Sequence, residues 1–192
     1  MRWRSIKSLT VIATFLWLPT VSRAQDDVML KAINLPAADQ WSILGSGETH
    51  ALVKDATVKG GWALTVDVTG VGANPRDIQA GVHTLKPIKQ GDVMLLAFWA
   101  RSVTPPEGAG VISIPANMQM AHTPYTRIGE QTLDIGPNWK LYYVSGVAPV
   151  DLAAGEASGG VQLATGKQSL ALGPIFMFDF GPKYDIGKLP HN

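Results

Sequence analysis

Planar polar side chains and aromatic rings occur together in three segments of this chain, and such a combination can bind a sugar. An aromatic face covers the C–H surface of a pyranose ring, while amide, guanidinium and carboxylate groups make paired hydrogen bonds to adjacent hydroxyls. The segments span residues 76–79, 99–101 and 117–125. The candidate ligand-binding residues in them are Arg76, Asp77, Gln79, Trp99, Arg101, Asn117, Gln119 and Tyr125.

Several of these residues also have a purely structural interpretation. Trp99 lies among apolar neighbours, so its context fits a core position as well as a cleft, and Arg101 can lay its aliphatic stem beside it. Asn117 and Gln119 are equally compatible with a solvated outer face. Trp62 follows the alternation of a buried strand face, so we expect it in the core.

Catalysis has little support in the sequence. A glycosidase needs two facing carboxylates about 5 to 9.5 Å apart, and no spacing in this chain pairs two strand carboxylates in that way. A hydrolase site built from Glu130 and Asp77 is the weakest of the alternatives. The chain also lacks the Gly-x-Ser-x-Gly, His-Glu-x-x-His and phosphate-loop motifs. We therefore expect a protein that is not an enzyme.

The run from Gly91 to Arg101 predicts the strand around which the fold is organised. The even-numbered residues 94–100 are Met, Leu, Phe and Ala, and the odd-numbered residues 93–99 are Val, Leu, Ala and Trp. Successive strand residues point to opposite faces, so both faces of this strand are apolar and it should lie inside a sheet.

The rest of the chain alternates in the same way over short stretches separated by turns. With no convincing amphipathic helix, this pattern predicts an all-β fold, an antiparallel β-sandwich, with a barrel as the alternative. Besides the central strand, the predicted strands span residues 26–33, 41–44, 50–53, 62–69, 76–80, 111–120, 125–135, 139–147, 161–165 and 174–180.

The N-terminus predicts an export signal. Basic residues precede the apolar run Leu9–Leu18, and Ser22-Arg23-Ala24 offers a cleavage site before Gln25. The apolar run is about half of the roughly 20 residues that a membrane span needs. We expect residues 1–24 to be removed, residues 25–182 to form one β-sandwich domain, and residues 183–192 to be a flexible tail. The mature protein would be periplasmic or extracellular, without a membrane partner.

Charge and cysteine content exclude further classes. Removal of residues 1–24 lowers the basic count from 16 to 12 against 15 acidic residues, which leaves a net charge near −3. No Lys/Arg cluster remains to follow a phosphate backbone, so we expect no nucleic-acid partner. The chain has no cysteine, so disulfides and thiol chemistry are absent.

The order of several short motifs resembles that of carbohydrate-binding modules of the CBM4/9/22 type, which have a galactose-binding-like β-jelly roll. The resemblance covers roughly residues 27 to 181. The motifs that carry it are Gly-Gly-Trp-Ala-Leu-Thr-Val at 60–66, Pro-Arg-Asp-Ile-Gln at 75–79, Lys-Gln-Gly-Asp-Val-Met-Leu-Leu-Ala-Phe-Trp-Ala-Arg at 89–101 and Trp-Lys-Leu-Tyr at 139–142.

The resemblance implies a fold and a site, with two departures. It implies that the three candidate segments are neighbours on one sheet of a jelly roll. Members often carry an aromatic residue where this chain has Arg76, which removes one stacking platform. Their last strand commonly carries two adjacent carboxylate or amide residues, where 176–180 has only Asp179, so a structural calcium is not supported and no cofactor is expected.

Together these observations predict an exported module that binds a polysaccharide or oligosaccharide without catalysis. Glycosidases or other exported proteins are its possible partners. The alternative from another class is a periplasmic protein-interaction or adhesion module that holds a protein on the same sheet.

Overall fold

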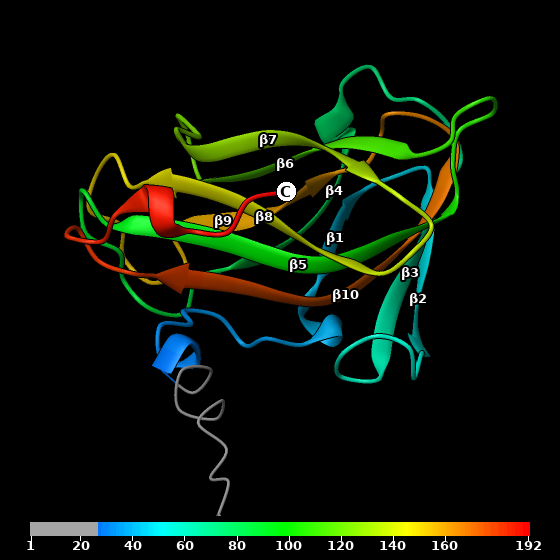
Figure 1. Ribbon diagram of the computed structural model, residues 1–192. Helices are drawn as coiled ribbons and strands as arrows, with labels where there is room; N and C mark the ends of the chain where they lie inside the picture. The colour runs from blue at the N-terminus through cyan, green and yellow to red at the C-terminus, as the bar shows by residue number, and fades with distance from the viewer. Residues whose placement is uncertain (1–26) are drawn as a thin grey trace, which may run out of the picture.

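Two antiparallel sheets packed face to face make up the protein (Figure 1). The computed structural model describes residues 27–192, and the predicted signal peptide lies outside the described residues. Each sheet has five strands, in the orders β1-β4-β9-β6-β7 and β2-β3-β10-β5-β8. The predicted antiparallel β-sandwich is confirmed.

We name each sheet after one of its interior strands, β6 or β5. The β6 sheet contains β1 (Ser42–Gly45), β4 (Ile78–His83), β9 (Ala157–Gln162), β6 (Ile112–Met120) and β7 (Arg127–Ile135). The β5 sheet contains β2 (Glu48–Lys54), β3 (Trp62–Val68), β10 (Gln168–Asp179), β5 (Val93–Thr104) and β8 (Lys140–Val147). Three short 3-10 helices span Ala38–Gln40, Pro75–Asp77 and Ile186–Lys188. Within the described residues, no helix has the length and apolar character that crossing a membrane requires.

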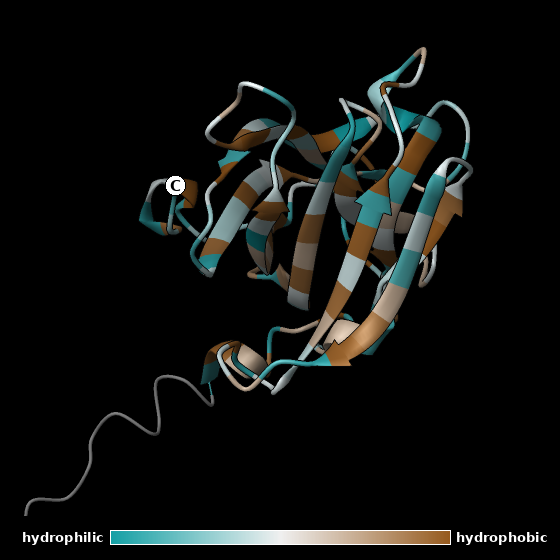
Figure 2. Ribbon diagram, turned by 90° about the vertical axis from the view of Figure 1, so that its right-hand side faces the viewer, coloured by the Kyte–Doolittle hydropathy of each residue, from teal (hydrophilic) through white to brown (hydrophobic). Residues whose placement is uncertain are grey.

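The core lies between the two sheets and follows the alternation of the strands, which Figure 2 shows as bands of apolar and polar residues along the ribbons. On β6, Ile112, Ile114, Ala116 and Met118 are buried, as the sequence predicts. Strand β5 is buried on both faces, because its even-numbered residues fill the main core and Val93, Leu95 and Ala97 join a second apolar cluster. The prediction of a doubly apolar strand inside a sheet is confirmed.

Several predicted strands have other bounds in the structure, among them the strand predicted at 76–80, which spans Ile78–His83, and the strand predicted at 174–180, which begins at Gln168. Residues 27–29 form a helical turn instead of part of a first strand, and only a single bridge, between Ala32 and Phe178, joins this segment to β10. The strand predicted at 161–165 begins earlier, at Ala157, because Gly159 and Gly160 lie in the middle of β9. Glycine is a poor strand former, so the sequence pattern hides this strand.

Trp62 is not a core residue. Its side chain is 41% exposed, and the ammonium of Lys54 lies 5.5 Å from the centre of its ring. The pairing of β10 with β3 ends at Leu64, so Trp62 lies beyond the last residue of β3 that is paired with β10. Alternation predicts the face of a strand on which a residue lies, but not where the opposing layer stops.

The C-terminal segment packs against the β5 sheet, contrary to the expectation that it has little to bury. Leu189 is buried in the cluster with Val93, Leu95 and Phe178. The side chain of Asn192 donates to the carbonyl oxygen of Tyr143 at 2.8 Å and accepts from the Tyr143 amide at 3.0 Å. The tail therefore covers apolar residues on the outer face of this sheet.

Candidate functional site

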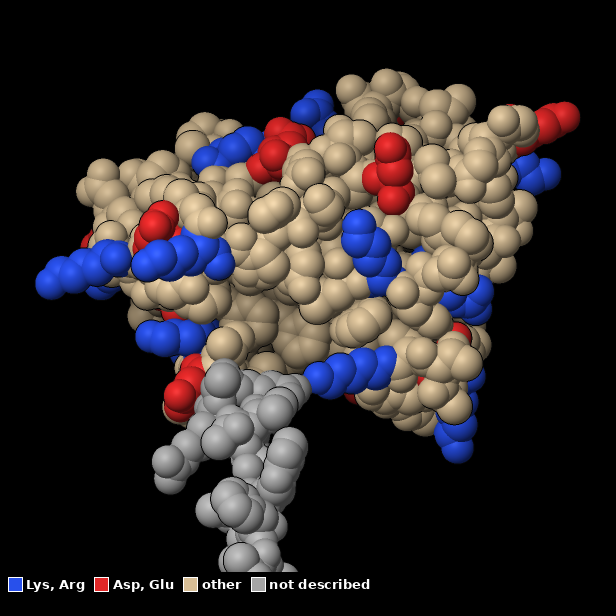
Figure 3. All heavy atoms as spheres, in the orientation of Figure 1, with Lys and Arg blue, Asp and Glu red and all other residues tan. Residues whose placement is uncertain are grey.

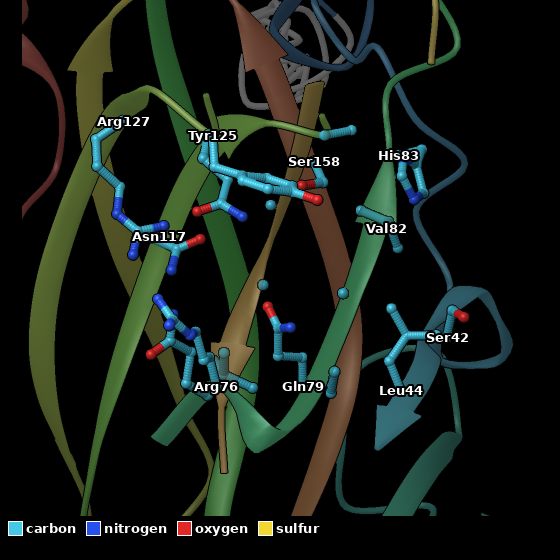
Figure 4. Close-up of a pocket in the computed structure, with 18 of the residues that line it drawn as sticks. Ser42, Leu44, Arg76, Gln79, Val82, His83, Asn117, Tyr125, Arg127 and Ser158 are labelled. Atoms are coloured by element: carbon cyan, nitrogen blue, oxygen red, sulfur yellow. The ribbon is translucent and has the colours of Figure 1, made fainter. Parts of the chain in front are cut away.

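A cleft of about 790 Å³ lies on the β6 sheet, on the face turned away from the core. Four strands, β1, β4, β9 and β6, supply its floor, and residues 76–77 and 121–127 supply its walls. This volume lies within the range of roughly 300 to 1,000 Å³ that is usual for ligand sites. Figure 4 shows the side chains that line it.

The strand register arranges the cleft residues in three rows across the sheet. Residues paired in an antiparallel ladder point to the same face, so each row forms a line of neighbouring side chains. The middle row is Ser42, Gly81, Gly160 and Asn117; one flanking row is Leu44, Gln79 and Gln162; the other is His83, Ser158 and Gln119. Amide side chains thus occupy both flanking rows and one end of the middle row.

Glycines leave the middle of the floor bare. A Cβ atom at Gly160 would lie 2.1 Å from the carbonyl oxygen of Ala80, and one at Gly81 would lie 2.9 Å from the carbonyl oxygen of Gly159. Such distances exclude a side chain unless the backbone moves. The close approach of β4 and β9 therefore requires glycine, and it also opens the trough between the amide rows.

Two of the amide side chains are buried without a protein partner. Asn117 is 6% exposed and Gln162 is 7% exposed, and both line the cleft. Neither side chain makes a hydrogen bond to another residue in the described part of the chain. Neither amide is among the fully buried unsatisfied groups of the described chain, so their polar atoms open into the cleft and are free to bond with something that enters it.

Tyr125 is the aromatic residue among the described residues that line the cleft. It is 53% exposed and has φ 56°, in the left-handed region that few non-glycine residues adopt. Its amide donates to the carbonyl oxygen of His122 at 2.7 Å, which fixes a tight turn between β6 and β7. Figure 4 shows its ring extending over the cleft near Ser158. A ring in this position offers one stacking surface.

Asp77 and Arg76 enter the cleft from the 3-10 helix before β4. The carboxylate of Asp77 accepts from the Asn74 amide at 2.9 Å and completes a capping box with the Asn74 side chain. Among the described residues, Arg76 makes no ion pair, not even with its neighbour Asp77.

Trp99 and Arg101 do not belong to this site. Both lie on β5, in the other sheet, so the expectation that the three candidate segments share one sheet is wrong. Trp99 packs beside Ala63 and Trp139, and the guanidinium of Arg101 lies 5.4 Å from the centre of the Trp139 ring. Strands β5 and β6 follow each other in sequence but enter opposite sheets, and a strand's residue pattern does not reveal which sheet it joins.

Arg101 instead serves the outer face of the β5 sheet. Its guanidinium lies 3.6 Å from the carboxylate of Asp55. Hydrogen bonds from the side chain and amide of Thr57 hold the pKa of Asp55 below its usual value; Trp139 and the charge of Arg101 contribute further. The carboxylate therefore stays ionised and holds Arg101 in place.

The arrangement of carboxylates in the cleft does not match a glycosidase. Asp77 is the one acidic residue among the described residues that line it. Glu130, on β7, pairs with Arg127 at 3.2 Å and does not line the cleft. No group of three His, Asp or Glu residues in the described chain is placed to hold a metal ion.

Sequence reasoning found six of the cleft residues, namely Arg76, Asp77, Gln79, Asn117, Gln119 and Tyr125. It missed the contribution of β9, because that strand was expected to start after Ser158 and Gly160. It also missed His83, which is three residues beyond the end of the segment predicted for β4. The alternation Gln79, Gly81, His83 was the available signal, and a longer strand would have placed all three on one face.

Comparison with known proteins identifies the architecture. No protein-family model matches the sequence, and no curated protein matches it. Among solved structures, a CBM4 module superposes with a TM-score of 0.54 and 16% identity over 79% of this chain and 99% of its own. The CBM22-1 xylan-binding domain from Paenibacillus barcinonensis Xyn10C gives 0.51 and 8% over 78% and 91%. The fold is that of carbohydrate-binding modules.

The same fold also occurs inside larger proteins. The MgGH51 α-L-arabinofuranosidase matches with a TM-score of 0.55 and 12% identity over 78% of this chain. This chain spans only 25% of that enzyme. At sequence identities this low, the superpositions show a shared fold and do not show a shared ligand.

Proposed function

We propose that the protein binds a polysaccharide or oligosaccharide in the cleft of the β6 sheet and does not cleave it. The amides of Asn117 and Gln162 carry this proposal, since they line the cleft beside its glycine floor and have no hydrogen-bond partner in the described chain. Sugar hydroxyls can donate to and accept from an amide at once, so they satisfy such groups fully. Tyr125 supports the proposal by offering a stacking surface at one end of the cleft.

The absence of catalysis is part of the proposal. Hydrolysis of a glycosidic bond requires two carboxyl groups separated by about 5 to 9.5 Å. The lining residues within the described chain include one acidic residue, Asp77, and its carboxylate closes its own turn. The site has many hydrogen-bonding groups and little acid–base chemistry, which suits binding.

A calorimetric titration of the protein with soluble β-glucans, xylans and mannans tests the proposal. The cleft lining contains no tryptophan, so tryptophan fluorescence would report binding there poorly. Tyr125→Ala should weaken binding by roughly tenfold, because stacking of an aromatic ring contributes on the order of 1 kcal/mol. Trp62→Ala is the matched control, an exposed aromatic residue on the β5 sheet. Absence of saturable binding to every polysaccharide would overturn the proposal.

Export remains part of the proposed function. Residues 1–24 have the pattern of a signal peptide, and the mature protein would act in the periplasm or outside the cell, beside glycosidases that degrade the same polysaccharide. The protein isolated from the periplasm or the culture medium should have Gln25 as its first residue, which N-terminal sequencing would show. Adding the protein to such an enzyme should speed cleavage of an insoluble polymer, whereas Tyr125→Ala should not.

One observation favours the protein-interaction module as a second candidate. An apolar hollow of about 330 Å³ lies on the outer face of the β5 sheet, lined by residues such as Trp99, Tyr143 and Phe176. Figure 3 shows mostly uncharged surface on this face with charged side chains around it, and Lys59 is the charged residue among the described residues that line the hollow. Sedimentation velocity tests the simplest case, self-association through this face, and Leu141→Asp should abolish any dimer. If sedimentation shows only monomer, self-association through this face is excluded.

A further inference from the structure

The charged groups of the cleft are unbalanced toward positive charge. Arg76, Arg127 and the ionisable His83 line it, against the single carboxylate of Asp77. That carboxylate already accepts the Asn74 amide at 2.9 Å and closes its own turn. This positive charge is a local property of the cleft, because residues 25–192 as a whole have a net charge near −3.

The two guanidinium groups are available to a ligand. Arg76 is exposed and makes no ion pair with another described residue. Arg127 pairs with Glu130 at 3.2 Å, but both side chains are well exposed, at 38% and 45%, so the pair is weak and screened by solvent. Figure 4 shows both arginine side chains reaching toward Asn117 from two sides of the cleft.

Asn117 adds an independent sign that a ligand belongs at this point. Its side chain is 6% exposed, faces the cleft and has no hydrogen-bond partner among the described residues. Its polar atoms are open to the cleft, and an amide NH₂ group can donate to an anion. Guanidinium groups bind planar oxyanions through paired, charge-assisted hydrogen bonds. The three side chains together offer donors to a negatively charged oxygen group.

We propose that the cleft selects an acidic polysaccharide, whose carboxylate or sulfate group binds between Arg76 and Arg127 next to Asn117. The inference rests on the proposed function and names the class of ligand for that site. The neutral amides, Gln79, Gln119 and Gln162, bind the hydroxyls of the sugar rings, and Tyr125 covers a ring face.

Matched polymers that differ only in charge test this selection. We would measure binding of the full-length protein, expressed with its own N-terminal segment, by calorimetry. The pairs are polygalacturonate and its methyl ester, glucuronoxylan and its carboxyl-reduced form, and dextran sulfate and dextran. We expect at least one acidic member to bind roughly tenfold or more tightly than its neutral partner, since a charged hydrogen bond contributes about 1.5 kcal/mol or more. The difference should shrink as salt is added.

The outcomes separate this inference from the proposed function. Equal binding to the two members of every pair that binds overturns the selection for charge and leaves sugar binding intact. Binding to no polymer, acidic or neutral, overturns both. Preference for the uronate polymers identifies a carboxylate as the ligand group, and preference for dextran sulfate alone identifies a sulfate.

Variants connect the selection to the named residues. Arg76→Gln and Arg127→Gln should each lower the preference for the acidic polymer over its neutral partner by roughly tenfold. Lys167→Gln removes the same charge from an exposed residue outside the cleft and should leave this preference unchanged. Thermal unfolding confirms that each variant is folded. An unchanged preference in both arginine variants would overturn the proposed anion site.

Discussion

The outer faces of the two sheets are built from the same strand geometry but have opposite characters. On the β6 sheet, the outward side chains are amides, arginines and small residues around a glycine floor, and the cleft above them stays open. On the β5 sheet, Phe176 and Phe178 of β10 and Phe180, directly after it, point outward, and their neighbouring rings lie 5.8 and 6.1 Å apart. The C-terminal segment covers part of this face and inserts Leu189.

The comparison separates residues that stabilise the fold from residues that are free to bind. An outward apolar face gains stability only when another part of the chain covers it, and the tail provides that cover. An outward polar face without internal partners contributes little to stability, so its side chains are available to a ligand. Variants on the β5 sheet should therefore affect unfolding, and variants in the cleft should affect binding.

The largest effect should come from Phe178→Ala on the β5 sheet. Its side chain is 6% exposed, and removing a buried aromatic ring typically costs about 3 kcal/mol or more of unfolding free energy. Urea unfolding should show this loss, while polysaccharide affinity of the folded variant stays unchanged. If the polysaccharide affinity fell in proportion to the unfolding free energy, the conclusion that the β5 sheet stabilises the fold and the cleft binds the ligand would be wrong.

A smaller loss should follow Leu189→Ala in the tail. Leu189 is 5% exposed, and a buried leucine that becomes alanine costs about 2 kcal/mol or more. Ile186→Ala is the control in the same segment, 41% exposed and expected to change stability by less than about 0.5 kcal/mol. Equal, negligible effects in both variants would show that the tail does not cover the β5 sheet in solution.

In the cleft, Asn117→Ala should show the reverse behaviour. We expect affinity for the preferred polysaccharide to fall by roughly tenfold, as the loss of about 1 to 1.5 kcal/mol for a hydrogen bond implies. The unfolding free energy should change little, because the amide has no internal partner to lose. Ser113→Ala, on the same strand outside the cleft, controls for the strand itself. A large loss of stability would instead make Asn117 a structural residue.

The smallest effect should come from Asp179→Asn at the end of β10. Burial raises the pKa of Asp179 above its usual value near 3.8, and the neighbouring Asp92 adds to the shift. A raised folded-state pKa gives a stabilising contribution at low pH, which is lost as the pH rises through the folded pKa. Asp179→Asn should therefore be more stable than the native protein at neutral pH, and the difference should disappear at about pH 3. A difference that does not change with pH would contradict this assignment.

Sequence alone determined the sandwich and most of the cleft. Alternation specifies which face of a strand is apolar, so the buried residues of β5 and β6 could be predicted from local pattern. The same rule placed Gln79, Asn117 and Gln119 on polar faces. The resemblance to CBM4/9/22 modules implied the jelly roll that the structure shows.

Tertiary structure alone decided how the strands are distributed between the sheets. Trp99 and Arg101 have the residue types of a binding site, but β5 enters the sheet opposite to the cleft. The glycines that look like a turn at 159–160 are the middle of a strand, because close strand packing there requires a residue without a side chain. Which face of a strand is apolar depends on the strand's own residues. Which sheet the strand joins, which strands pair with it and which segment packs on its outer face depend on contacts between segments far apart in the chain.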